Sequence, residues 1–313
     1  MYAIEVENLT KTYAGGVEAV RGISFEVAPG EVFGLLGPNG AGKSTTVGML
    51  TTTIVPTDGS ARLHGFDVGA SPIAARAISS VVFQEAVVDR ALTGRQHLAV
   101  HASLWLVDPR EAEARIADLA VSFDLSHLID RAVGTYSGGE RRRLEIARAL
   151  VSQPRVLFLD EPTVGLDPRI RAELLDAIAD LRDTGETTIL LTTHYLDEAE
   201  RLCDRLAIMH EGRVVALDRP NALRADLGAQ IVEVRTRDDA DATLGLLRQL
   251  GLAGGDAFSV GATVTIPLHD RTAASAIAGI EAAGVSVSAI GTREPTLDDV
   301  YLHLTGGRLA LAA

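Results

Sequence analysis

The run from Gly37 to Thr45 combines residue types that bind a polyphosphate. It reads Gly-Pro-Asn-Gly-Ala-Gly-Lys-Ser-Thr. Glycines allow consecutive backbone N–H groups to converge on an anion at a helix N-terminus. Lys43 would then reach the β- and γ-phosphates, and Ser44 a magnesium ion. We therefore expect a nucleoside triphosphate to bind through Gly37, Pro38, Asn39, Gly40, Ala41, Gly42, Lys43, Ser44 and Thr45.

The choice of lysine at position 43 supports this interpretation. The chain holds 29 Lys and Arg residues, yet only Lys11 and Lys43 are lysines. A compact ammonium fits inside a phosphate loop, whereas a planar guanidinium does not. The sequence contains no Asn-Lys-x-Asp motif to read a guanine base, which argues against a GTPase.

Asp160 and Glu161 follow the apolar run Val-Leu-Phe-Leu at 156–159. Adjacent side chains at a strand tip point in different directions, so one can face a metal and the other a water in line with the γ-phosphate. Asp160 suits the metal role and Glu161 suits the role of base. Taken alone, Asp-Glu-Pro could equally be a solvated strand exit.

Ser137, Gly138, Gly139 and Glu140 precede a helical pattern and allow two interpretations that can hold together. The first is a capping box, with Ser137 as N-cap and Glu140 at the third helical position. The second is another anion site, because two glycines at a helix N-terminus expose several N–H donors. A plain cap needs no glycine pair, so the glycines favour anion binding.

Three further features of the sequence have an ordinary structural explanation when each is taken alone. His194 could be an ordinary histidine at a strand end, and Tyr13 could be a packing residue near a turn. We interpret the run 141–143, which is three arginines, as a solvated helix face.

Apolar strands must position these residues. Val32–Leu36 leads into the phosphate loop, and short apolar runs end at Gln84, Asp160 and His194. Strands that are apolar on both faces and alternate with helices predict a covered parallel or mixed sheet, which binds ligands beyond its carboxyl ends. From about 93 to 150 the pattern is helical, starting with Thr93 and Gln96 at capping-box spacing.

After about residue 224 the pattern changes. Strand and helix signals follow in the order βαββαβ, which is typical of a ferredoxin-like unit. A last helix is expected after Pro295, with Thr296 and Asp299 at capping spacing.

The composition limits the function classes. A formal net charge of −13 argues against a nucleic-acid partner. Cys203 is the only cysteine, so we expect no internal disulfide and a buried core position for it. The N-terminus looks like a strand and not a secretion signal, and no apolar run has the length of a membrane span. We expect a soluble protein.

Taken in order, these motifs resemble those of ATP-binding cassette (ABC) ATPases over about the first 220 residues. They are the loop 37–45, Gln84, the segments 136–140, 157–162 and 165–167, and His194. The resemblance implies an α/β P-loop NTPase fold with a mixed sheet. It implies an ATP-binding domain at 1–225, with a helical subdomain at about 93–150. The element pattern of the remaining chain predicts a small α+β ferredoxin-like domain at 226–313.

The resemblance also implies roles for single residues and a partner. Two copies would form a head-to-tail homodimer around two ATP molecules, with Ser137 to Glu140 of one copy contacting the ATP of the other. Tyr13 would stack on adenine, and His194 would contact the γ-phosphate. Ser44, Gln84 and Asp160 would hold Mg²⁺, and Asp167 would line the dimer seam. Tyr136 departs from the leucine most common at its position.

The segments 136–144 and 294–301 are similar to those of daunorubicin/doxorubicin-resistance ATP-binding subunits. That resemblance implies a bacterial exporter ATPase at the cytoplasmic face of the cell membrane, paired with an integral membrane permease that exports a hydrophobic drug. Catalysis would rest on Glu161, His194 and Lys43. Another cargo such as a lipid or polysaccharide, import, a non-transport ABC ATPase and a vestigial regulatory ATPase are the alternatives.

Overall fold

The computed structural model describes residues 1–84 and 88–306. The chain divides into two compact units, Met1–Val214 and Val215–Ala313. The predicted boundary lay after residue 225, whereas helix α8 (Pro220–Asp226) falls in the second unit. Residues 85–87 of the predicted ATP-binding domain and 307–313 of the predicted C-terminal domain lie outside the described residues.

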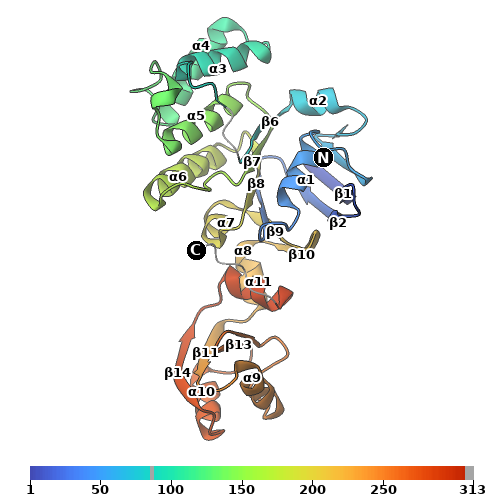
Figure 1. Ribbon diagram of the computed structural model, residues 1–313, viewed down its shortest axis with the longest axis vertical. Helices are drawn as coiled ribbons and strands as arrows, with labels where there is room; N and C mark the ends of the chain where they lie inside the picture. Colours follow the sequence, from blue (N-terminus) through green and yellow to red (C-terminus); the bar gives the residue numbers. More distant parts are fainter. Residues whose placement is uncertain (85–87, 307–313) are drawn as a thin grey trace. The chain divides into compact units, whose positions relative to one another are not determined.

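A six-stranded sheet forms the centre of the first unit, with the unit boundary falling inside its edge strand β10 (Figure 1). Its order is β10-β9-β3-β8-β7-β6, and the strands from β9 to β6 run parallel. All residues of β3, β7 and β8 are buried, as expected for a sheet covered on both faces. The strands are β3 (Val32–Leu36), β6 (Ser79–Val82), β7 (Val156–Asp160), β8 (Thr188–Thr193), β9 (Arg205–His210) and β10 (Arg213–Asp218).

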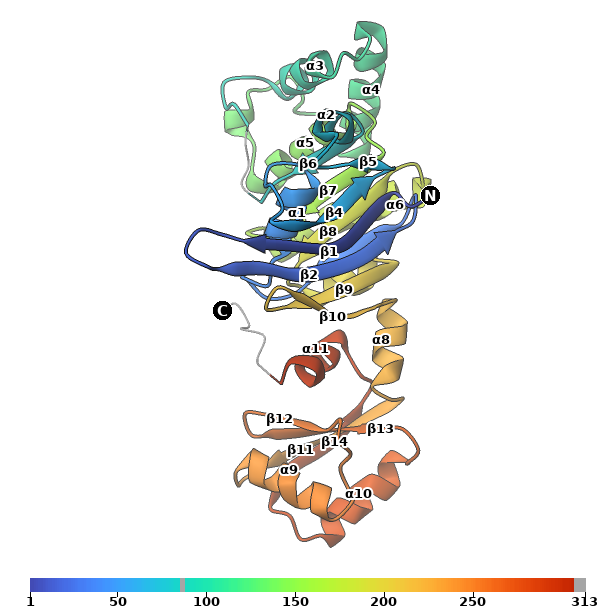
Figure 2. The same ribbon diagram turned by 90° about the vertical axis from the view of Figure 1, so that its right-hand side faces the viewer.

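A second, antiparallel sheet has the order β2-β1-β4-β5. Helix α1 (Lys43–Leu50) contacts β2 and β4 of this sheet and β7 of the parallel sheet, so it lies between the two (Figure 2). The remaining elements of this part are β1 (Ile4–Thr12), β2 (Glu18–Val27), β4 (Asp58–Leu63), β5 (Phe66–Asp67) and α2 (Pro72–Ala77).

Two helices lie on the other side of the parallel sheet from α1 (Figure 1). Helix α7 (Leu196–Leu202) contacts β3 and β8, and α6 (Pro168–Thr184) packs on α7 and on α5. Cys203 directly follows α7 and is buried, which confirms the predicted core position.

The segment predicted to be helical at 93–150 is several separate helices. They are α3 (Gly94–Leu104), α4 (Pro109–Ser122), the short 3₁₀ helix η1 (Val133–Thr135) and α5 (Gly138–Leu150). The predicted capping box is present, because Gln96 N donates to Thr93 Oγ1 and Thr93 N donates to Gln96 Oε1. Helices α3, α4 and α5 contact one another.

The second unit has the predicted element order. Its antiparallel sheet runs β12-β13-β11-β14, the strand order of a ferredoxin-like fold. Its apolar core packs α9 and α10 on that sheet. The elements are β11 (Gln230–Thr236), α9 (Ala240–Gln249), β12 (Phe258–Val260), β13 (Thr263–Leu268), α10 (Ala273–Ala282), β14 (Val287–Arg293) and α11 (Leu297–Thr305).

Within residues 1–84 and 88–306, every helix is too short or too polar to cross a membrane.

Candidate active site

The phosphate loop connects the end of buried strand β3 to the first turn of α1. Gly42 precedes the helix with φ of 101°, a conformation that costs a side-chain-bearing residue strain. A Cβ added there would lie 2.5 Å from the carbonyl oxygen of Ala19. Glycine is therefore required at this turn, and α1 starts directly behind the loop.

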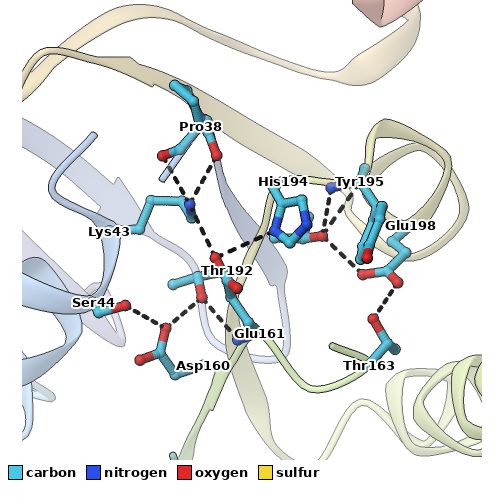
Figure 3. A network of polar contacts seen from close by, with 12 residues as sticks. Pro38, Lys43, Ser44, Asp160, Glu161, Thr163, Thr192, His194, Tyr195 and Glu198 are labelled. Atoms are coloured by element: carbon cyan, nitrogen blue, oxygen red, sulfur yellow. Dashed lines mark hydrogen bonds and ion pairs between the residues drawn. The ribbon is translucent and has the colours of Figure 1, made fainter. Parts of the chain in front are cut away.

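Lys43 is buried beneath this loop. Its Nζ donates to the carbonyl oxygens of Gly37, at 2.8 Å, and Pro38, at 3.2 Å (Figure 3). The same Nζ lies 3.1 Å from Glu161 Oε1, and both side chains are buried. The ammonium is therefore held between the loop and the end of β7.

Glu161 is placed by an unusual backbone conformation just after β7. Its φ is 45°, in the left-handed region that costs a non-glycine residue about 1–3 kcal/mol and is concentrated at functional sites. Its N–H donates to Thr192 Oγ1 at 2.9 Å. His194 Nδ1 lies 3.4 Å from Glu161 Oε1, so the carboxylate stands between Lys43 and His194 (Figure 3).

Asp160 has different polar partners from Glu161, although both carboxylates reach the first turn of α1. Its Oδ1 accepts hydrogen bonds from Ser44 Oγ at 3.1 Å and Thr192 Oγ1 at 2.6 Å. The Thr192 hydroxyl thus holds both acidic residues: it donates to the Asp160 carboxylate and accepts from the Glu161 N–H. The adjacent acids of the sequence have separate environments, as predicted for a strand tip.

A further buried carboxylate, that of Glu198, lies next to the site formed by Lys43, Asp160, Glu161 and Thr192. Glu198 of α7 accepts hydrogen bonds from Thr193 Oγ1, at 2.8 Å, and from Thr163 Oγ1. Burial raises the pKa of Glu198 above the ordinary value, an effect only partly offset by these hydrogen bonds and by Arg171. The loop after Glu161 and the end of β8 are joined through this one side chain.

Most predicted nucleotide contacts line one cleft of about 500 Å³. Its lining residues are Tyr13, Val17, Glu18, Ala19, Asn39, Gly40, Gly42, Lys43, Ser44, Thr45, Gln84 and Glu161. Tyr13 is partly exposed, and its hydroxyl is 3.4 Å from Thr45 Oγ1. Tyr13, directly after β1, and Glu161, directly after β7, therefore face the same cleft.

The Ser-Gly-Gly segment and Asp167 are not among the described residues that line this cleft. Ser137 caps α5 in a complete capping box with Glu140, whose pKa is lowered chiefly by the N–H of Ser137. Gly139 lies so close to the side chain of Ile170 that any Cβ would clash. Asp167 caps α6 through Ile170 N. Both helix starts thus lie side by side, outside the cleft.

The interpretation of the arginine run as a solvated face is wrong for Arg142, which is buried. It shares a helix face with the buried residues Ile146 and Leu150, four and eight positions on, because α-helical neighbours recur at that spacing. That periodicity was the available signal. Thr192 and Glu198 were also missed, since one polar residue in an apolar strand or on a short helix has no distinctive pattern.

A glycine-rich loop between a buried parallel strand and a helix, facing an acidic strand tip, defines a P-loop nucleoside triphosphatase. The profile of the family described as "ABC transporter" matches residues 20–164. The daunorubicin resistance ATP-binding protein DrrA2 of Streptomyces coeruleorubidus is 42% identical, over 98% of this chain and 96% of that protein. The Nod factor export ATP-binding protein I of Rhizobium meliloti is 38% identical, over 98% of this chain and 89% of its own length.

A solved structure of an ATP-binding subunit of an ABC transporter has a TM-score of 0.65 and 30% identity, covering 72% of this chain and 92% of that one. The chain therefore belongs to the ABC transporter family, as an ATP-binding, ATP-hydrolysing subunit.

Proposed function

We propose that this chain energises the efflux of a hydrophobic drug through a separate membrane permease. The observation that carries the ATPase part is the contact of Glu161 with both Lys43 and His194 at the carboxyl ends of three neighbouring strands. The drug part is supported by the 42% identity to a daunorubicin resistance ATP-binding protein.

In this proposal the Lys43 ammonium neutralises the β- and γ-phosphates and leaves the polyphosphate in line with Glu161. Glu161 accepts a proton from the attacking water, since general bases act within hydrogen-bond reach of the proton they take. His194 contacts the γ-phosphate from the end of β8. The positions of Lys43 and His194 support these roles, because both side chains contact the same carboxylate oxygen, Glu161 Oε1.

The residues around Ser44 fit a magnesium ion. Mg²⁺ prefers oxygen ligands and is bound through one or two protein groups plus substrate phosphates and water. The Ser44 hydroxyl and the Asp160 carboxylate are 3.1 Å apart, and Gln84 lines the same cleft. The ion would supply charge neutralisation of the transferring phosphate, with Ser44, Asp160 and Gln84 as its protein ligands.

Tyr13 is expected to stack on the adenine, and replacing it tests that role. Base–aromatic stacking contributes about 1–3 kcal/mol per base, so Tyr13→Ala should weaken ATP binding about tenfold. Tyr13→Phe keeps the ring and should bind ATP like the wild type, because the contact of the hydroxyl with Thr45 is long. Equilibrium titration with a fluorescent ATP analogue measures both. Equal affinity of the alanine variant and the wild type would leave Tyr13 as a packing residue.

We further propose that ATP joins two copies head to tail, with Ser137, Gly138 and Gly139 of one copy contacting the γ-phosphate held by the other. The exposure of Ser137 and Gly138 and their place outside their own cleft support this arrangement. N–H groups and the helix dipole favour an anion at such a helix start. Asp167, at the neighbouring helix start, would line the seam between the copies.

A membrane partner is supported by apolar side chains on the helical subdomain. Leu104, Trp105 and Leu106 follow one another at the end of α3 and are 70%, 40% and 91% exposed. A contiguous group of exposed apolar residues indicates an interaction surface, whereas a single exposed apolar residue does not. We propose that this surface contacts the permease, which would hold the chain at the cytoplasmic face of a bacterial membrane.

Transport by the reconstituted pair tests the cargo. Inside-out vesicles carrying this chain and its permease partner should accumulate daunorubicin when ATP is added. Vesicles with the permease alone, or with the Glu161→Gln chain, should not. Fluorescence quenching of the drug measures its uptake.

ATP hydrolysis by the pair without movement of the drug would contradict the drug assignment and leave the ATPase assignment standing. The second candidate is then export of another cargo. It is supported by the relative named for Nod factor export, which matches nearly the whole chain.

A further inference from the structure

Arg142 is buried although it stands between two partly exposed arginines. Arg143, one position on, points to Asp124 and Glu173, whose side chains are exposed. Arg142 instead points toward the interior of the first unit. A guanidinium carries five N–H donors in a rigid plane and is seldom buried unless they are satisfied. The hydrogen-bond partners of this buried guanidinium therefore indicate the role of Arg142.

The partners of Arg142 are mainly backbone carbonyls at the ends of two strands. Nε donates to Pro162 O at 2.8 Å, and Nη1 donates to Phe83 O at 2.6 Å. Nη2 is 3.2 Å from Asp160 O and 3.4 Å from Glu161 O. Buried Glu145, one turn along α5, orients the guanidinium through an ion pair of 3.1 Å.

These carbonyls belong to the segments that place the reacting groups. Glu161 has the strained backbone described above, and its N–H is already fixed by Thr192. Arg142 fixes three consecutive carbonyl groups around it, those of Asp160, Glu161 and Pro162. Phe83 directly precedes Gln84, so the same guanidinium also holds the approach to that residue.

Arg142 is also part of the first turns of α5, the helix that starts at Ser137 and its glycines. We propose that Arg142 is a positioning residue for hydrolysis. It fastens the backbone of Glu161 to α5, so that a displacement of this helix start by the nucleotide of the partner copy is passed to the catalytic carboxylate of the same chain. The inference deepens the proposed function and rests on it.

The substitution Arg142→Lys tests the geometry while keeping the charge. An ammonium is a point donor on a flexible stem and cannot replace a planar fork that reaches carbonyls on two strands. ATP should bind within twofold of the wild type, while kcat falls about tenfold to 100-fold, the reach of a misplaced catalytic group. Arg143→Lys is the matched control and should leave both unchanged. A kcat within twofold of that control would overturn the proposal, as would a parallel loss of ATP affinity.

A double-substitution cycle separates positioning from general damage. If Arg142 acts through Glu161, adding Arg142→Lys to Glu161→Gln should lower the residual single-turnover rate less than threefold, because residues that act as a unit are non-additive. A further tenfold loss would overturn the proposal. If Arg142→Lys does not fold, Glu145→Gln removes the charge that orients the guanidinium and should reproduce the selective loss of kcat. An unchanged kcat in Glu145→Gln would likewise overturn it.

The outcomes for the two proposals can be told apart. Normal turnover of the Glu161→Gln chain would remove the proposed catalytic site and this inference with it. A large effect of Glu161→Gln combined with an additive Arg142→Lys would remove the inference alone.

Discussion

Replacing Glu161 with glutamine is expected to leave ATP binding intact and to lower turnover by about 10²- to 10⁴-fold, the range for a positioned general base. Glutamine has nearly the same shape, so the hydrogen bonds around the backbone of residue 161 should persist. It carries no charge and accepts a proton from water far less readily. The ion pair with Lys43, at 3.1 Å, is lost at the same time.

That last loss should not weaken nucleotide binding. Lys43 keeps its bonds to the carbonyls of Gly37 and Pro38, and its charge is then fully directed at the phosphates. We expect the affinity for ATP to be equal to or tighter than that of the wild type. Affinity without turnover is the result that separates a catalytic group from a binding group.

Phosphate release and equilibrium titration with a fluorescent ATP analogue provide the two measurements. Glu111→Gln is a suitable control, because Glu111 is an exposed residue of α4 that pairs with Arg115 and does not line the cleft. Turnover of the Glu161→Gln chain within threefold of the wild type would rule out Glu161 as the base. Loss of ATP binding would instead show that the substitution damages the whole cleft.

Much of the fold could be predicted because its signals are local. The apolar runs at Val156 and Ile189 identified β7 and β8 to within one residue at each end, since a strand covered on both faces is apolar along most of its length. The order βαββαβ similarly predicted the second unit. The break of the region 93–150 into separate helices was less evident, because turns between amphipathic helices interrupt the pattern only briefly.

The phosphate loop was predictable for the same reason, since its residues are adjacent in the chain. The contacts that complete the site were not predictable, because they join residues that are far apart in the chain. Arg142 reaches Phe83 across 59 positions, and Thr192 holds Asp160 across 32. A polar residue inside a helix or strand becomes informative only when the elements are packed. Sequence periodicity indicates that such a residue is buried, but it does not name the partner.

Lys43→Ala is expected to abolish detectable nucleotide binding. The ammonium is buried, and truncating one member of a buried hydrogen-bonded charge pair costs about 2–5 kcal/mol, or roughly 30-fold to several thousandfold in affinity. Glu161 would then face the phosphates without a cation between them, which adds like-charge repulsion in a buried place. Lys43→Arg should also bind poorly, because the guanidinium is too large for the space under the loop.

The chain offers its own control, since Lys11 is its other lysine. Lys11 Nζ donates to Val55 O at 2.7 Å and lies 5.2 Å from the centre of the Tyr13 ring. An exposed cation–π contact contributes about 0.5–1 kcal/mol, so Lys11→Ala should change ATP affinity no more than about fivefold. If Lys43→Ala bound ATP as well as Lys11→Ala does, the loop would not be gripping phosphate. The charge at position 43 would then serve only to balance Glu161, and the fluorescence titration that gives the two affinities decides between these roles.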